Sequence, residues 1–315
     1  MQCPRLKHFV RFNPNGTVSR CGHMVNAPQF ESLAEMESSL WLNGIKSEFE
    51  YGRWPTECVR CQETETVNRT SIRLNAIEFH NKQTVSDYLI VGGVLDNICN
   101  SGCFTCSADY STKIGSLSAK IFPLVDNRDR FWQLPLNQIV HLDINGGEPS
   151  ASKNYREILK NPPPKVNSIR INTNCSIIID EIEELLAKNI KVTVTISLDG
   201  IGQVHDFVRW PIKWEKFYKN LMYYKSIKNL QVNTWTTVSA LNIGNLLAIK
   251  QFVANHQLEH SYAFLHHPDP LNVKYKNNLT LPFIKLFPHI VAVERNNQNE
   301  LDSFLQQQKN LRDIK

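Results

Sequence analysis

The sequence has no long hydrophobic run and no N-terminal apolar core followed by a cleavage site. A membrane-spanning helix needs about 20 apolar residues, and a secretory signal needs an apolar core. We therefore expect a cytoplasmic protein with no membrane partner. Disulfides are rare in that reducing compartment, so the eight cysteines are expected to bind metal rather than to pair with one another.

Clustered basic charge is also missing. The formal net charge is +5, and the Lys and Arg residues are scattered along the chain. A protein that follows a nucleic-acid backbone usually presents a basic stripe. Internal repeats and long low-complexity tracts are absent as well. These absences weigh against nucleic acid as a partner and leave a globular chain with 42% hydrophobic residues.

What the sequence does contain is a tight group of three cysteines, Cys99, Cys103 and Cys106, after the apolar run 88–91. Thiolates are the ligands of iron-sulfur clusters, and a loop at the end of a strand can direct three of them to one cluster while leaving one iron open. The alternative is three buried free thiols. The polar loop between the cysteines disfavours that alternative, and the spacing predicts a metal site.

With this C-x3-C-x2-C pattern the chain resembles the radical S-adenosylmethionine (SAM) superfamily. The resemblance implies a 4Fe-4S cluster whose fourth iron binds SAM, and reductive cleavage of SAM to a 5′-deoxyadenosyl radical. The run Gly146, Gly147, Glu148 and Pro149 matches the GGEP motif of that superfamily, which contacts the amino group of SAM. An electron donor such as flavodoxin or ferredoxin is then implied as a partner.

Three polar residues are assigned to SAM by the same resemblance. Ser197 and Arg209 belong to a stretch, residues 197–209, similar to one in peptide- and protein-modifying members of the superfamily. Ser197 and Asn174 are expected near the ribose or the carboxylate of SAM. Arg209 is expected to bind a carboxylate, and a surface ion pair with Asp206 or Glu215 is the alternative.

Further candidates rest on weaker signals. Phe104 is expected near the adenine of SAM or in the core, and Asn242 near SAM or at a helix N-cap. Trp235, Tyr262 and His266 lie on or after the last two predicted strands. They are candidates for the substrate pocket, where a Tyr or His can move a proton or position a substrate.

A second metal site is predicted from Cys3, Cys21, Cys58 and Cys61. A predicted hairpin and a predicted helix, which runs from Leu33 towards Glu48, lie between these cysteines. The layout resembles the twitch or SPASM modules that hold an auxiliary 4Fe-4S cluster, although such modules normally follow the barrel. Four thiolates also suit a zinc ion, and ligand identity leaves the choice between iron and zinc open.

From residue 83 onward, β-branched runs alternate with helical patterns, which is typical of βα units and a parallel sheet. Six strands are expected, at residues 88–94, 138–144, 166–172, 190–197, 230–238 and 260–266. Helices are expected between them and in the C-terminal stretches 282–297 and 301–312. The resemblance implies an α/β fold with three parts: a cysteine-rich hairpin-helix module at 1–82, a partial (β/α)6 TIM-like barrel at 83–270, and a helical extension at 271–315.

The sequence therefore predicts a radical SAM enzyme that modifies a peptide or protein side chain. Two alternatives stay open. One is a radical SAM enzyme that acts on a small metabolite or a tRNA base. The other is a binding protein with structural zinc at the N-terminal cysteines and a degenerate barrel.

Overall fold

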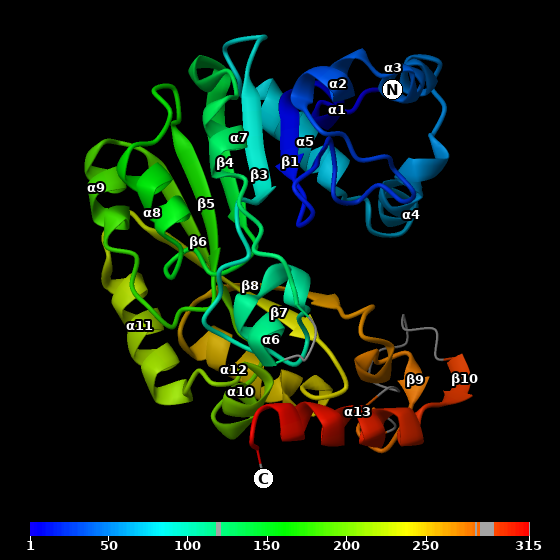
Figure 1. Cartoon of the computed structure of the whole chain (residues 1–315), viewed down its shortest axis with the longest axis vertical. Coiled ribbons are helices and arrows are strands. Elements are labelled where there is room, and N and C mark those ends of the chain that lie inside the picture. Colours follow the sequence, from blue (N-terminus) through cyan, green and yellow to red (C-terminus); the bar gives the residue numbers. More distant parts are fainter. Residues whose placement is uncertain (118–120, 281, 284–292, 315) are drawn as a thin grey trace.

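A mostly parallel eight-stranded sheet organises the computed structural model (Figure 1), which describes residues 1–117, 121–280, 282–283 and 293–314. The strand order is β2-β1-β3-β4-β5-β6-β7-β8. The strands are β1 (Phe9–Phe12), β2 (Val18–Ser19), β3 (Leu89–Val94), β4 (Ile139–Asn145), β5 (Ser168–Thr173), β6 (Lys191–Ser197), β7 (Gln231–Val238) and β8 (Glu259–Phe264).

The six predicted strands are present as β3 to β8, and all neighbours among them pair in parallel. Their side chains alternate in character. In β6, Val194 and Ile196 are fully buried, whereas Thr195 and Ser197 lie on the opposite face. Four helices follow strands of this sheet: α8 (Lys153–Lys160), α9 (Glu181–Ala187), α11 (Trp214–Ser226) and α12 (Leu246–Asn255). Their buried side chains share one hydrophobic core with the apolar face of the sheet, and Figure 1 shows α8, α9 and α11 on one side of the strands.

The N-terminal hairpin is part of this sheet. β1 pairs in parallel with β3, and β2 pairs antiparallel with β1. The sequence placed the hairpin in a module before the barrel, but its first strand extends the parallel sheet by one position. Cys21, two residues after β2, is thereby held at the edge of the main sheet.

Five helices complete the N-terminal part. They are α1 (Arg5–His8), α2 (Leu33–Ser38), α3 (Leu40–Glu50), α4 (Val59–Asn68) and α5 (Ile72–Asn81). The single helix expected from Leu33 towards Glu48 is two helices. Ser39 has an extended backbone and accepts a hydrogen bond from the Leu42 N–H, so it ends α2 and caps α3.

The C-terminal part contains both strands and a helix, whereas two helices were expected there. Residues 284–292 of the helix expected at 282–297 lie outside the described residues, and its last part is a strand, β10 (Val293–Asn296), which pairs in parallel with β9 (Tyr275–Lys276). The second expected helix is present as α13 (Gln298–Leu311). Three short helices, α6 (Thr112–Leu117), α7 (Arg128–Trp132) and α10 (Gln203–Val208), lie in the loops after β3 and β6. No helix in the described ranges has both the length and the apolar character that a membrane span requires.

Candidate functional site

A cavity of about 260 Å³ opens where β4, β5 and β6 end, and we call it the three-cysteine cavity. The carboxyl ends of parallel strands are where α/β folds place ligands. Most residues assigned to the cluster and to SAM from sequence line this one cavity. They are Cys99, Cys103, Cys106, Gly146, Gly147, Glu148, Asn174, Ser197 and Arg209.

The cysteine loop is held by hydrogen bonds from distant segments. Gly102 N–H donates to the Trp210 carbonyl at 2.7 Å, and Phe104 N–H donates to the Val208 carbonyl at 3.0 Å. The buried Arg312, just after α13, donates from Nε to the Gly102 carbonyl at 2.8 Å. Most of these anchors are backbone groups, and none of the three involves a thiol.

The sulfurs of the loop gather around a hydroxyl. Ser101 Oγ lies 3.4 Å from Cys99 Sγ and 3.4 Å from Cys103 Sγ. Asn174 Nδ2 donates to the same Oγ at 3.3 Å. Asn174 therefore ties the end of β5 to the cysteine loop, while Cys106 lies on the exposed side of the cavity.

The paired glycines let the loop after β4 approach the cysteine loop. Both have left-handed backbones, with φ of +82° at Gly146 and +54° at Gly147. A Cβ on Gly147 would lie 2.6 Å from the Ile98 carbonyl oxygen, and one on Gly146 would lie 2.7 Å from a methyl of Val94. Glycine is needed at both positions because no side chain fits.

Glu148 locks this approach in place. Its buried carboxylate accepts hydrogen bonds from Ser150 Oγ and Thr173 Oγ1, each at 2.6 Å, and from the Asn174 N–H at 2.6 Å. Its own N–H donates to the Ile98 carbonyl at 2.7 Å. The carboxylate thus joins the ends of β4 and β5, and its oxygens are already engaged by protein donors.

Arg209 faces the thiols from the end of α10. Its Nη1 donates to Asp199 Oδ2 at 2.7 Å, and both side chains are largely buried. Burial alone would lower the pKa of Arg209, but the neighbouring Cys103 and Asp199 raise it overall. The alternative of a surface ion pair is wrong, because Asp206 pairs with Lys213 and Arg209 lines the cavity.

Three other sequence candidates lie outside the cavity lining. Phe104 is 1% exposed and packs between Phe207, at 4.5 Å between ring centroids, and the Arg312 guanidinium, at 4.4 Å. This placement matches its alternative as a core residue. Pro149 and Asn242 are buried as well, and Asn242 Nδ2 donates to the Asp199 and Thr237 carbonyls.

An aromatic residue that sequence reasoning missed does line the cavity. Tyr110 follows the cysteine loop and is 36% exposed. Phe104 is the aromatic residue predicted from the sequence to lie near adenine, but the Ala108–Tyr110 helical turn brings a different ring to the cavity wall. The sequence feature that could have indicated this residue is a tyrosine shortly after the third cysteine.

A larger cavity of about 620 Å³, the central cavity, lies on the polar face of the sheet. It shares Asn172 and Ser197 with the three-cysteine cavity. Trp235 lines it, and its role in binding a substrate stays a prediction. Tyr262 and His266 are exposed and line neither cavity. Tyr262 pairs with Thr236, whose side chain points to the opposite face of the sheet, and His266 lies beyond the end of β8.

Apart from Ser197, the polar wall of the central cavity was not predicted from the sequence. Its side chains come from alternate positions of β4, β5 and β6, which are His141, Asp143, Arg170, Asn172, Thr195 and Ser197. Arg170 donates from Nε and Nη2 to both oxygens of Asp143, at 2.8 and 2.7 Å. The sequence feature that could have indicated this wall is the strict alternation of polar and apolar residues along the strands, because the residues between the polar ones are buried and apolar.

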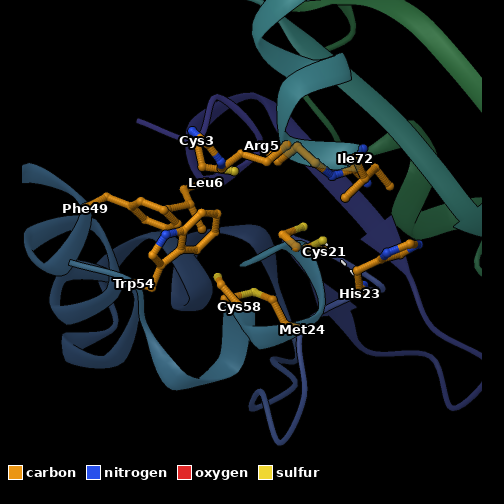
Figure 2. Close-up of a pocket in the computed structure, with 12 residues that line it drawn as sticks. Cys3, Arg5, Leu6, Cys21, His23, Met24, Phe49, Trp54, Cys58 and Ile72 are labelled. Atoms are coloured by element: carbon orange, nitrogen blue, oxygen red, sulfur yellow. Dashed lines mark hydrogen bonds between the residues drawn. The ribbon is translucent and has the colours of Figure 1, made fainter. Parts of the chain in front are cut away.

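The four N-terminal cysteines line a third cavity together, and we call it the four-cysteine cavity. Figure 2 shows Cys3, Cys21 and Cys58 around it, with Phe49 and Trp54 on one side. Cys61 also lines it and lies in the first turn of α4, where burial raises the pKa of its thiol. It shares Arg5, His23 and Ile72 with the central cavity, so the three cavities form a row.

Burial disfavours the thiolate forms of Cys3 and Cys58. It raises the pKa of Cys3 to about 11, with help from Cys21, and that of Cys58 to about 12, with help from Cys3. Within the described part of the chain, no three or more His, Cys, Asp or Glu side chains are placed to hold a metal ion. The thiols of each cysteine cavity thus share a wall without converging on a single ion.

Comparison with known proteins gives limited guidance. No protein-family model matches the chain, and no curated protein matches it. Among solved structures, polyhistidine-tagged anSMEcpe with bound AdoMet has 18% identity and a TM-score of 0.46, over 61% of this chain and 55% of that one. Streptococcus suis SuiB bound to S-adenosylmethionine has 15% identity and a TM-score of 0.43, over 86% and 59%.

A further SuiB structure, bound to the precursor peptide SuiA, has 14% identity and a TM-score of 0.41, over 86% of this chain and 60% of that one. The chain thus spans between about half and three fifths of the length of these three solved structures. Identities and TM-scores at this level establish no family membership. Function must be inferred from the residues of the site.

Proposed function

We propose that the protein is a radical SAM enzyme with two 4Fe-4S clusters, which cleaves S-adenosylmethionine reductively to modify a peptide or protein side chain. One observation carries the proposal: the cysteines, the GGEP loop and the polar residues assigned to SAM from separate segments line one cavity. An α/β sheet with a different function would not need to bring these residues to one cavity. The site residues, rather than the fold, therefore support the proposal.

Cys99, Cys103 and Cys106 would hold the first cluster through three irons. When bound, a reduced cluster supplies the electron that cleaves SAM. The protein contributes a fixed thiol loop, a guanidinium at Arg209 that offsets thiolate charge, and a Gly146–Gly147 backbone that lines the space for a ligand. Tyr110 is the aromatic side chain available to contact adenine there.

Cys3, Cys21, Cys58 and Cys61 would hold the second cluster. A zinc ion requires its four sulfurs about 2.3 Å from a single point. The four thiols line one cavity, and a cluster of several irons accepts the same four thiolates; the resemblance to twitch modules is what favours iron over zinc. A module of this kind at residues 1–82, a partial barrel at 83–270 and a C-terminal extension at 271–315 remain our proposed organisation.

The central cavity would hold the substrate, because it lies between the two cysteine cavities and shares lining residues with each. Its volume of about 620 Å³ falls within the usual range of ligand pockets, about 300 to 1,000 Å³. A peptide segment is the substrate we favour, on the resemblance of residues 197–209 to peptide-modifying enzymes. A reductant such as flavodoxin or ferredoxin would supply electrons.

The direct test uses wild-type protein reconstituted with iron and sulfide under anaerobic conditions. We expect about eight irons per chain, as two 4Fe-4S clusters require, and formation of 5′-deoxyadenosine from SAM after reduction with dithionite. Protein that binds only zinc, or that holds iron but forms no 5′-deoxyadenosine, would contradict the proposal.

Arg209 is expected to support SAM binding. Replacing it with Met in an Arg209→Met/Asp199→Asn double variant should weaken SAM affinity about 10- to 100-fold, the loss expected when a charged hydrogen bond is removed. The second change avoids leaving the buried Asp199 carboxylate without its partner. Affinity measured by equilibrium dialysis at unchanged iron content would isolate this effect, and wild-type affinity would exclude Arg209.

A further inference from the structure

The central cavity has an unbalanced charge on its wall. Of the two arginines that line it, Arg170 is neutralised by a two-bond contact with Asp143. Burial lowers the pKa of His141 to about 4, so its imidazole is neutral near pH 7. The remaining arginine is Arg5, and across the described ranges no carboxylate forms an ion pair with it.

The charged end of Arg5 faces the central cavity. Its guanidinium carbon lies 3.5 Å from the centroid of the Phe9 ring, and Phe9 lines the central cavity but not the four-cysteine cavity. Burial opposes ionisation of Asp143, but its pKa is lowered overall, chiefly by Arg170 and least by Arg5, which lines the same cavity. Figure 2 shows the side chain running from beside Cys3 towards Ile72, where the two cavities meet.

A partly buried cation that forms no ion pair with a carboxylate is costly to maintain, and Arg5 has only the thiols of the four-cysteine cavity and the more distant Asp143 as negative neighbours. The Nε of Arg5 is buried and has no hydrogen-bond partner. An arginine in this state is suited to a ligand that brings its own negative charge, because guanidinium can grip a carboxylate through two parallel hydrogen bonds.

We propose that Arg5 binds a carboxylate of an acidic peptide substrate in the central cavity; this inference rests on the proposed function. A carboxylate fits better than a phosphate, because one free guanidinium matches a single negative charge and Arg170 is already engaged by Asp143. The peptide would be held at the end of the cavity remote from Asn172 and Ser197. Those two residues border the three-cysteine cavity, so the reacting side chain would lie between them and the anchored carboxylate.

The experiment measures peptide binding to the reconstituted holoenzyme by isothermal titration calorimetry, so it does not depend on turnover. The probes are acetyl-Ala-Gly-Glu-Gly-Ala-amide, its Gln analogue, and acetyl-Ala-Gly-Gly-Ala with a free C-terminal carboxylate. The variants are Arg5→Met and Arg5→Lys. Arg53→Met is the matched control, because Arg53 is an exposed arginine of the same N-terminal part and pairs with Glu48 outside the cavities.

We expect wild type to bind a carboxylate peptide at least about tenfold more tightly than the Gln peptide, since a charged hydrogen bond is at stake. Arg5→Met should abolish that preference, Arg5→Lys should keep part of it, and Arg53→Met should keep all of it. Preference for the Glu peptide or for the free C-terminus then identifies the source of the carboxylate.

Equal binding of the Glu, Gln and free-acid peptides by wild type would overturn the inference without any variant. A preference that survives in Arg5→Met, together with a shifted midpoint potential of the second cluster, would overturn it too and assign Arg5 to the cluster charge. Failure of wild type to cleave SAM would instead count against the proposed function, which the binding measurement does not test.

Discussion

Replacing Cys99, Cys103 and Cys106 together with Ala is expected to abolish 5′-deoxyadenosine formation from SAM. All three thiolates are needed to hold a cluster whose fourth iron stays open. The loop should keep its path, because its backbone bonds to Trp210 and Val208, at 2.7 and 3.0 Å, involve no sulfur. The measurement is product formation by anaerobic, dithionite-reduced protein, with circular dichroism to confirm that the fold is retained.

Cys175 offers a matched control for this variant. It is fully buried, lies in none of the three cavities, and its carbonyl accepts a hydrogen bond from Asn220 Nδ2 at 2.8 Å. We expect Cys175→Ala to retain wild-type iron content and SAM cleavage. If the triple variant still formed 5′-deoxyadenosine, the three-cysteine cavity would not be the site of SAM cleavage.

Cys175, which follows β5, has a backbone conformation that is unusual for a residue with a side chain. The residue has φ of +60°, in the left-handed region that glycine favours. The backbone therefore takes the conformation expected of glycine, at a conformational cost of about 1 kcal/mol or more that the surrounding contacts must offset.

The order of the six parallel strands could be predicted because each is a short β-branched run separated by a helical pattern. The position of the N-terminal hairpin could not. Residues 9–12 read as half of a local hairpin, and nothing nearby in sequence indicates that Phe9 pairs with Ile90 across about 80 residues. Long-range pairing of this kind depends on the assembled sheet rather than on local propensity.

For the site, the sequence indicated the motif residues but not the residues that contact them. Motif residues such as Glu148 and Arg209 line the three-cysteine cavity together with the cysteines, and their role in binding SAM stays a prediction. Their hydrogen-bond and ion-pair partners were not predicted. Asp143 and Arg170 meet because β4 and β5 pair in the register that sets these two residues side by side. A one-residue shift would send one of them to the apolar face, so the ion pair is a property of strand register.

The four-cysteine cavity is expected to keep its cluster when the ligands of the other cluster are removed. In the triple Cys99/Cys103/Cys106→Ala variant we expect about four irons per chain to remain, as one cubane cluster requires, with an electron paramagnetic resonance signal on reduction. The reason is spatial separation, because the four-cysteine and three-cysteine cavities share no lining residue. Loss of one cluster should therefore leave the ligands of the other in place.

Adding Cys58→Ala and Cys61→Ala to the triple variant is expected to remove the remaining iron, since two of the four thiolates would be gone. Adding Cys175→Ala instead should leave it unchanged. Metal analysis of the three proteins side by side separates iron from zinc directly. One zinc per chain and no iron in the triple variant would contradict the auxiliary-cluster proposal. Both zinc and an iron-sulfur cluster accept four thiolates, so only the identity of the bound metal distinguishes them. The three-cysteine cavity would then be the only redox centre we propose, and the N-terminal cysteines would serve to stabilise the fold around β1 and β2.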